Sequence, residues 1–222
     1  MDAHTDVRGA KSYMNTLEIK KLKIPSGYET RVFVIDGKPL YEYLNVWVNG
    51  NDDVLYAPDF LEITWTNDYD FEGDAKFMRF VLSQNGAITP ILSCPDDFDF
   101  SCTVVVVDVV RQGDSVIWKR IGRVDHTNED LEEELKHGIL YTEAYTEEDW
   151  EKYGSSIALE EVHSSAWGDW IGANWAEELY RRRVNYTFPY YQNEDNIIWI
   201  ADCNFKFSKE EYDKLVESCY DG

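Results

Sequence analysis

The stretch FDFSCTVVVVDVVRQGDSVIWKRIGRV, residues 98–124, decides the fold. Residues 98–110 are rich in β-branched side chains, which are typical of strands. Gln112-Gly113-Asp114 is a turn sequence, and residues 115–124 resume a strand pattern. We therefore expect two long antiparallel strands at the centre of the chain.

Shorter apolar runs extend the same pattern toward the N-terminus. Each run ends at a turn sequence that contains Gly, Pro, Asn or Asp. The expected strands cover residues 31–36, 40–48, 61–71, 76–82 and 87–92. Turns at this spacing favour an antiparallel β-meander in the first half of the chain.

The second half combines helical and extended patterns. A capping box, Ser208-x-x-Glu211, predicts a terminal helix. Further helices are expected at 129–137, at 147–153 and in the latter part of 166–183, and extended segments at 185–191 and 196–202. The predicted fold class is therefore α+β, with an antiparallel β-meander in the first half and helices and additional strands in the second half.

No linker-like composition divides the chain into domains. Residues 1–14 are a polar leader that we expect to be flexible, and residues 15–222 are expected to form a single α+β domain. No run of 18 apolar residues occurs, and the leader lacks the apolar region of a secretory signal. The four cysteines have no metal-ligand spacing, so reduced thiols and a cytoplasmic location are expected.

The charge balance is the strongest functional signal. The chain has 43 acidic and 21 basic residues, a formal net charge of -22. The excess is greatest after residue 127, and between residues 129 and 161 only Lys136 and Lys152 oppose it. Such a surface repels nucleic acids and anionic membranes and attracts basic proteins. The alternative is a general solubility charge on solvated helix faces.

The acidic stretch TNDYDFEGDAKFMR, residues 66–79, resembles the start of a calcium loop. Such a loop needs a bidentate glutamate at its twelfth position, where this chain has Arg79. Apolar and acidic residues also alternate with period two, which predicts a strand with an acidic outer face. Its carboxylates could pair with Lys76 or Arg79 on a neighbouring strand, or meet a basic partner.

We expect a non-catalytic acidic binding or inhibitor protein that neutralises a basic protein partner. The chain carries no motif of either class, but its composition is similar to that of two classes of protein. These are immunity proteins (antitoxins) that block bacterial toxins, and nucleic-acid mimics that inhibit nucleic-acid-binding enzymes. No catalytic or metal motif occurs, and no cofactor is expected. The expected partner-binding residues are Asp68, Asp70, Glu72, Glu132, Glu133, Glu147, Glu148, Asp149 and Trp150.

Two alternatives remain open. Trp167, Trp170 and Trp175 approximate a helical stripe near carboxylates, which is compatible with a carbohydrate-binding or glycoside-hydrolysing module. Aromatic stripes are more often part of a core, however. Adaptation to high salt would also explain the acidic surface, although the lysines and large aromatic residues weaken that interpretation.

Overall fold

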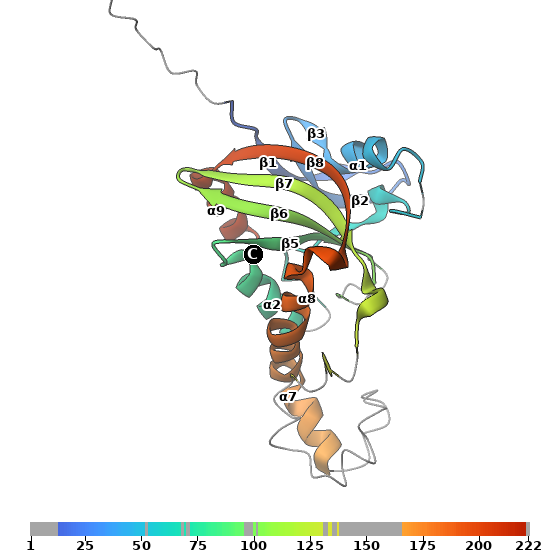
Figure 1. Ribbon diagram of the computed structural model, residues 1–222, viewed down its shortest axis with the longest axis vertical. Coiled ribbons are helices and arrows are strands. Elements are labelled where there is room, and N and C mark those ends of the chain that lie inside the picture. Colours follow the sequence, from blue (N-terminus) through green and yellow to red (C-terminus); the bar gives the residue numbers. More distant parts are fainter. Residues whose placement is uncertain are drawn as a thin grey trace, which may run out of the picture.

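The computed structural model describes residues 13–51, 53–67, 69, 72–95, 100, 102–130, 133–134, 137 and 166–220, with the backbone alone at 166–172. Most of the predicted leader, residues 1–12, lies outside this set. The described chain is an α+β structure with two antiparallel sheets, as the sequence predicts (Figure 1).

The larger sheet is a five-stranded antiparallel meander in the order β4-β5-β6-β7-β8 (Figure 1). Its strands are β4 Glu62–Ile63, β5 Gly86–Ser93, β6 Val104–Gln112, β7 Ser115–Val124 and β8 Ile197–Ser208. The predicted central hairpin is β6 and β7, and the predicted strand at 196–202 is the first half of β8. The β-branched runs were predicted as strands correctly because their composition leaves few alternatives. The first strand was predicted over 98–110 but begins at Val104, and the described residues 100, 102 and 103 are not part of it.

The smaller sheet has the order β1-β2-β3, with β1 Leu17–Lys23, β2 Glu29–Ile35 and β3 Lys38–Pro39. Asn15 connects it to the larger sheet. The Asn15 backbone N–H donates to the carbonyl of Lys206 at 2.6 Å, and the Asn15 side-chain amide donates to Asp36 Oδ2 at 2.6 Å. The two sheets are therefore joined where the described chain begins.

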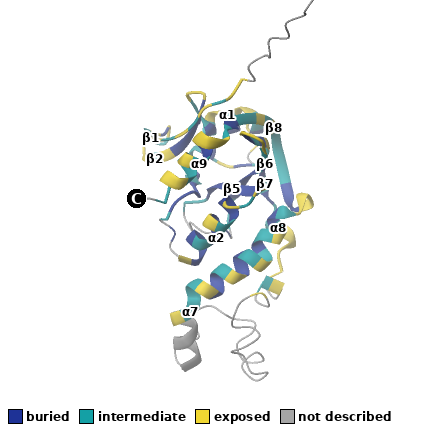
Figure 2. Ribbon diagram, turned by 90° about the vertical axis from the view of Figure 1, so that its left-hand side faces the viewer, coloured by how far each residue is buried: buried dark blue, intermediate teal, exposed yellow. Residues whose placement is uncertain are grey.

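Helices lie beside the sheets. They are α1 Leu40–Val48, α2 Glu72–Leu82, α7 Ala166–Arg182, α8 Phe188–Gln192 and α9 Lys209–Ser218. Helix α7 extends away from the sheets in both views and contacts α2 along its C-terminal part (Figures 1 and 2). It continues through a π-helical turn, η3 Arg183–Thr187, into α8. The short turns η1 Pro58–Phe60, η2 His126–Asn128 and η4 Glu194–Asn196 complete the described elements.

The core is centred on two tryptophans whose donors are satisfied. Trp65 and Trp118 are 1% and 0% exposed and meet edge to face, with ring centroids 6.1 Å apart. Trp65 Nε1 donates to the carbonyl of Pro90 at 3.1 Å, and Trp118 Nε1 donates to the hydroxyl of Tyr212 at 3.2 Å. Buried indoles need such partners, so these contacts fix β5, β7 and α9 around one core.

Two predicted strands are helices. Residues 40–48 form α1, in which Leu40, Leu44 and Val48 lie one turn apart and are buried. Residues 76–82 belong to α2, whose buried residues also follow a helical period. The strand prediction relied on apolar composition, but the spacing of the buried side chains in both segments is helical.

Two other extended predictions also need correction. Among the described residues of 61–71, which exclude 68, 70 and 71, only Glu62–Ile63 is a strand. Thr64 and Thr66, expected on the outer face, are 0% and 1% exposed. Residues 185–191 are helical and belong to η3 and α8, where Pro189 lies in the first turn, a position that a helix tolerates. Helices α7 and α9 are confirmed, although Ser208 makes no side-chain capping hydrogen bond.

Candidate functional site

The predicted partner-binding residue Glu72 is the first residue of α2, where a carboxylate complements the helix dipole. Its Oε1 lies 3.2 Å from Lys76 Nζ, which lies 2.6 Å from Glu177 Oε1 on α7. The side chains of Glu72 and Glu177 are 70% and 54% exposed. The predicted pairing with Lys76 therefore exists, but along one helix instead of across two strands.

Glu133 is exposed and helical, and it belongs to a segment that is tied to η3. The Glu133 N–H donates to Asp130 Oδ1 at 3.2 Å, and the Asp130 N–H donates to the Tyr186 hydroxyl at 2.6 Å. Burial raises the pKa of Tyr186, although the hydrogen bond from Asp130 opposes this shift. Asp130 thus caps the segment and holds Glu133 at the surface beside η3.

A buried ion pair links the elements that carry these exposed carboxylates. Arg183 Nε donates to Asp74 Oδ1 at 2.8 Å, and Arg183 Nη1 lies 3.5 Å from Glu134 Oε1. Burial alone would lower the pKa of Arg183, but the carboxylates of Asp74 and Glu134 outweigh it and hold this pKa above its usual range. Helix α2, the η3 turn and the segment around Glu133 therefore share one charged centre.

The other predicted partner-binding residues lie outside the described residues: Asp68, Asp70, Glu132, Glu147, Glu148, Asp149 and Trp150. The predicted helix at 147–153 lies outside as well, and of 129–137 only Glu133 and Glu134 are described as helical. The two predicted residues that the structure describes, Glu72 and Glu133, belong to elements that both contact η3.

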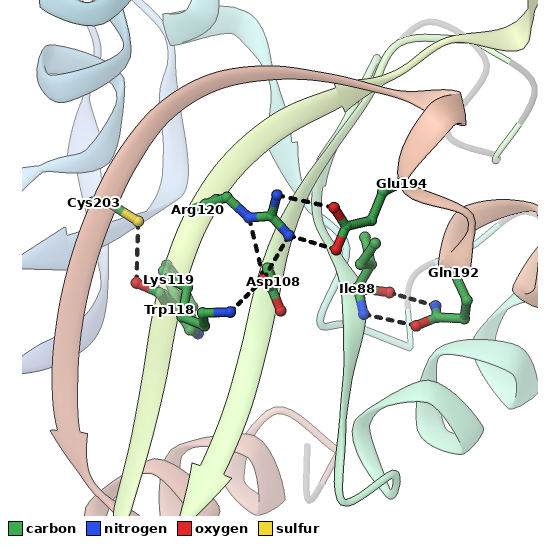
Figure 3. Close-up of polar contacts among 8 residues, drawn as sticks. All are labelled: Ile88, Asp108, Trp118, Lys119, Arg120, Gln192, Glu194 and Cys203. Atoms are coloured by element: carbon green, nitrogen blue, oxygen red, sulfur yellow. Dashed lines mark hydrogen bonds and ion pairs between the residues drawn. The ribbon is translucent and has the colours of Figure 1, made fainter.

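A second charged cluster lies on the face of the larger sheet (Figure 3). Arg120 Nη2 is 2.9 Å from Asp108 Oδ2 and 2.8 Å from Glu194 Oε1, and Lys119 Nζ is 3.4 Å from Asp108 Oδ2. The hydrogen bonds from Arg120 lower the pKa of Glu194. Two cations and two carboxylates neutralise each other here, so the cluster adds no surplus charge to the surface.

A groove of about 740 Å³ separates the C-terminal end of α2 from α9. Asp213 lies inside it and is 2.6 Å from Arg111 Nη1 and 2.5 Å from Lys209 Nζ. Burial alone would raise the pKa of Asp213, but the hydrogen bonds from Lys209 and Arg111 hold it below its usual range. The charged side chains that line the groove have both signs. Arg79, Arg111 and Lys209 are basic, and Asp213 and Glu217 are acidic.

The described tryptophan side chains are in part used within the fold. Trp65 and Trp118 are buried in the core, and Trp47 and Trp199 are partly buried and pack against it. Guanidinium groups lie over two rings, with Arg182 5.3 Å from the ring centre of Trp175 and Arg120 4.0 Å from that of Trp199. Stacking on a sugar requires an accessible face. The side chains of Trp150, Trp167 and Trp170 lie outside the described residues.

Sequence reasoning did not predict three exposed aromatic side chains, Tyr28, Tyr56 and Phe60, which we call the aromatic patch. Tyr28 is in the β1–β2 turn, and the other two are in the connection between α1 and β4. Their sequence signal is an aromatic residue near Gly or Pro in a turn: Tyr28 follows Gly27, and Tyr56 and Phe60 lie two residues before and after Pro58.

Within the described residues, no group of three or more His, Cys, Asp or Glu side chains is arranged to hold a metal ion. No helix in this part of the chain is long and apolar enough to cross a membrane. No family model, curated protein or solved structure matches the chain. The function is therefore argued from charge, exposure and geometry.

Proposed function

We propose that this protein is a non-catalytic binding protein whose carboxylates neutralise a basic protein partner. An immunity protein (antitoxin) that blocks a bacterial toxin is the form we favour, and a nucleic-acid mimic that inhibits a nucleic-acid-binding enzyme is the second form. The observation that carries the proposal is the net charge of -22, combined with the internal use of most described basic side chains.

Most of the described lysine and arginine side chains form intramolecular ion pairs. Among the described lysines and arginines, those that pair with carboxylates are Lys20, Lys21, Lys76, Arg111, Lys119, Arg120, Arg182, Arg183, Lys209 and Lys214. These cations neutralise nearby carboxylates at short range, and some share a partner, as Arg111 and Lys209 share Asp213. The carboxylates left over dominate the field at the distance from which a partner approaches.

Several carboxylates are exposed and form no ion pair with any described residue. They are Glu42 on α1, Asp53 before β4, Asp114 in the β6–β7 turn, Asp195 in η4 and Glu211 on α9. A carboxylate without an internal cation keeps its full hydration and can exchange it for an arginine or lysine of a partner. Such a surface favours fast, salt-sensitive association with a basic protein and disfavours nucleic acid.

The carbohydrate alternative has less support. Of the described tryptophans, Trp65 and Trp118 are buried in the core and arginines lie over the rings of Trp175 and Trp199. The carboxylates of the sheet-face cluster are both held by Arg120. Glycoside hydrolysis needs two carboxyl groups that are free to act on the bond. The binding-protein proposal therefore has more support than the carbohydrate alternative.

Affinity capture from a lysate of the source organism, at low and high salt, tests the proposal. We expect a basic protein to be retained at low salt and released at high salt, because ionic screening weakens attraction between exposed charges. An unrelated acidic protein of equal size and net charge serves as the control for retention by charge alone. Capture of the same proteins by both baits, or of no basic protein at any salt, would contradict the proposal.

The two forms of the proposal differ in one measurable respect. A nucleic-acid mimic occupies the nucleic-acid site of its partner, so an oligonucleotide should displace it competitively. An immunity protein can instead block a toxin at another surface. Competition between an oligonucleotide and this protein for the captured partner therefore supports the mimic, and simultaneous binding supports a different blocking surface.

A further inference from the structure

The three side chains of the aromatic patch are exposed, and two of them, Tyr28 and Phe60, lie close together. Tyr28, Tyr56 and Phe60 are 68%, 75% and 43% exposed, whereas the aromatic rings of the core are almost completely buried. The rings of Tyr28 and Phe60 lie 6.4 Å apart between centroids, tilted by 57°. Two separate connections of the chain thus present aromatic rings at one place on the surface. Exposed clusters of this kind mark interaction sites more often than scattered single residues do.

The turn that carries Tyr28 packs on buried side chains and is closed by a backbone hydrogen bond. Beneath the β1–β2 turn lies a separate small cluster of buried side chains, Ile24, Val32 and Val34, which are 4%, 6% and 2% exposed. The Ile24 N–H donates to the carbonyl of Tyr28 at 2.8 Å and closes the turn. Because the backbone at Tyr28 is fixed by this contact, little backbone order would have to be gained on binding.

Ala57, between Tyr56 and the η1 turn, has a left-handed backbone conformation with φ of 43°. The other non-glycine residues with positive φ are Asp or Asn, which adopt this region more readily than alanine. The Phe60 N–H donates to the carbonyl of Ala57 at 3.0 Å and keeps the turn closed. A strained residue held in place between two exposed aromatic side chains is typical of a functional surface.

Carboxylates belong to the elements that carry or adjoin the patch. Asp59 precedes Phe60 in η1, and Glu42 is on α1, which contacts η1. The pKa of Tyr41 on α1 is raised first by burial and then by these two carboxylates. Neither forms an ion pair with a described residue, and neither does the exposed Asp53. The hairpin cations Lys21, Lys23 and Arg31 have the opposite strand parity from Ile24 and so lie on its other face. Lys20 shares the face of Val32, but its ammonium group lies 2.8 Å from the carboxylate of Glu18.

We propose that the aromatic patch and its carboxylates, Glu42, Asp53 and Asp59, form the docking surface for the basic partner and take its arginine side chains. This inference rests on the proposed function and adds its location and chemistry. A guanidinium group stacks on an aromatic face and pairs with a carboxylate at the same time, which an ammonium group does less well. Aromatic side chains in the centre with a polar rim are the usual arrangement of a binding hot spot.

The test uses a short peptide of alternating arginine and glycine as the probe, with the full chain labelled with ¹⁵N. Amide chemical shifts are followed by NMR during titration near physiological ionic strength. We expect the largest shifts in residues 24–28, 41–46 and 53–60. A lysine–glycine peptide of equal length and charge should bind more weakly, because it loses most of the stacking contribution.

Matched variants separate the patch from bulk charge. Tyr28→Ser with Phe60→Ser should weaken binding of the arginine peptide about tenfold, whereas Tyr13→Ser, which removes an aromatic ring that is 74% exposed elsewhere, should not. Glu42→Gln with Asp59→Asn should weaken binding more than Asp114→Asn with Glu211→Gln, although both pairs remove the same charge. Circular dichroism confirms that each variant is folded.

The outcomes distinguish this inference from the proposed function. Shifts spread over α9 and β8, or equal losses from the two charge variants, would overturn the docking surface while leaving attraction to basic proteins intact. No binding of the arginine peptide even at low ionic strength would overturn the docking surface, and failure of the lysate capture would independently overturn the proposed function.

Discussion

At the scale of single residues, Gly73 sets how closely α2 and α7 approach. A Cβ atom placed on Gly73 would lie 2.7 Å from the carbonyl oxygen of Ala176 and 2.8 Å from Leu179 Cβ. Real Cβ contacts are longer, so the helices would have to separate. The short distance also places Asp74 next to Arg183, which connects the exposed carboxylates of α2 to those beside η3.

Gly73→Ala should lower the free energy of unfolding by about 1–3 kcal/mol, because the new methyl group forces the two helices apart. Urea denaturation measures the change. Glu72→Ala, one position earlier and exposed, should stay within about 0.5 kcal/mol of the wild type. Equal stability of Gly73→Ala and the wild type would show that α2 and α7 are not packed this closely.

Asp74→Asn should destabilise the protein by about 3–5 kcal/mol, because it leaves the buried Arg183 with only the more distant carboxylate of Glu134. Glu72→Gln removes a carboxylate of an exposed ion pair and should change stability by less than about 1 kcal/mol. The comparison uses the same denaturation experiment. Similar small effects at both positions would mean that the buried pair does not hold α2 to η3.

At the scale of elements, the long β-branched strands and the helices α7 and α9 were easier to predict than the short apolar segments. The β6–β7 hairpin followed from uninterrupted β-branched residues and an evident turn. Helices α1 and α2 were missed because short, aromatic-rich apolar runs suit either structure, and only the spacing of Leu40, Leu44 and Val48 indicates a helix. The η3–α8 segment was missed because tertiary contacts override its extended propensity.

Less of the candidate site could be predicted. The acidic surplus is a property of the composition, but which carboxylates are neutralised depends on partners far apart in the sequence, as with Lys76 and Glu177. The contact between Tyr28 and Phe60 joins two connections that no local pattern relates. Exposure of an aromatic residue is a result of the complete fold, and a single sequence does not reveal it.

Helix α9 is attached to β6 through Asp213, which makes this attachment dependent on pH. Against the effect of burial, hydrogen bonds from Lys209 and Arg111 hold the pKa of Asp213 in the folded protein below that of an unfolded aspartate, so its contribution to stability is complete above the unfolded pKa and is lost as the pH falls through the folded pKa. Asp213→Asn should reduce the unfolding free energy by about 1–2 kcal/mol at pH 7.

The difference between Asp213→Asn and the wild type should shrink below about pH 4, as the wild-type carboxyl group takes up a proton. Urea denaturation at a series of pH values follows both proteins. A difference that stays constant from pH 7 to pH 3 would show that the ion pairs of Asp213 with Arg111 and Lys209 do not stabilise the fold.

At the scale of the whole molecule, internal ion pairs leave an excess of acidic side chains. Most of the described basic side chains pair with carboxylates of the same chain, and the aromatic patch lies at one place on the surface. Long-range attraction would bring a basic protein to this molecule, and the aromatic side chains would give the complex its short-range contacts.

The most direct test of this account is the association rate constant of the captured partner, measured by stopped-flow tryptophan fluorescence as a function of ionic strength. We expect the rate constant to fall by about tenfold or more from low to high salt, with a much smaller change in the dissociation rate constant. An association rate constant that is independent of salt would contradict the claim that the carboxylate surplus exists to attract a basic protein.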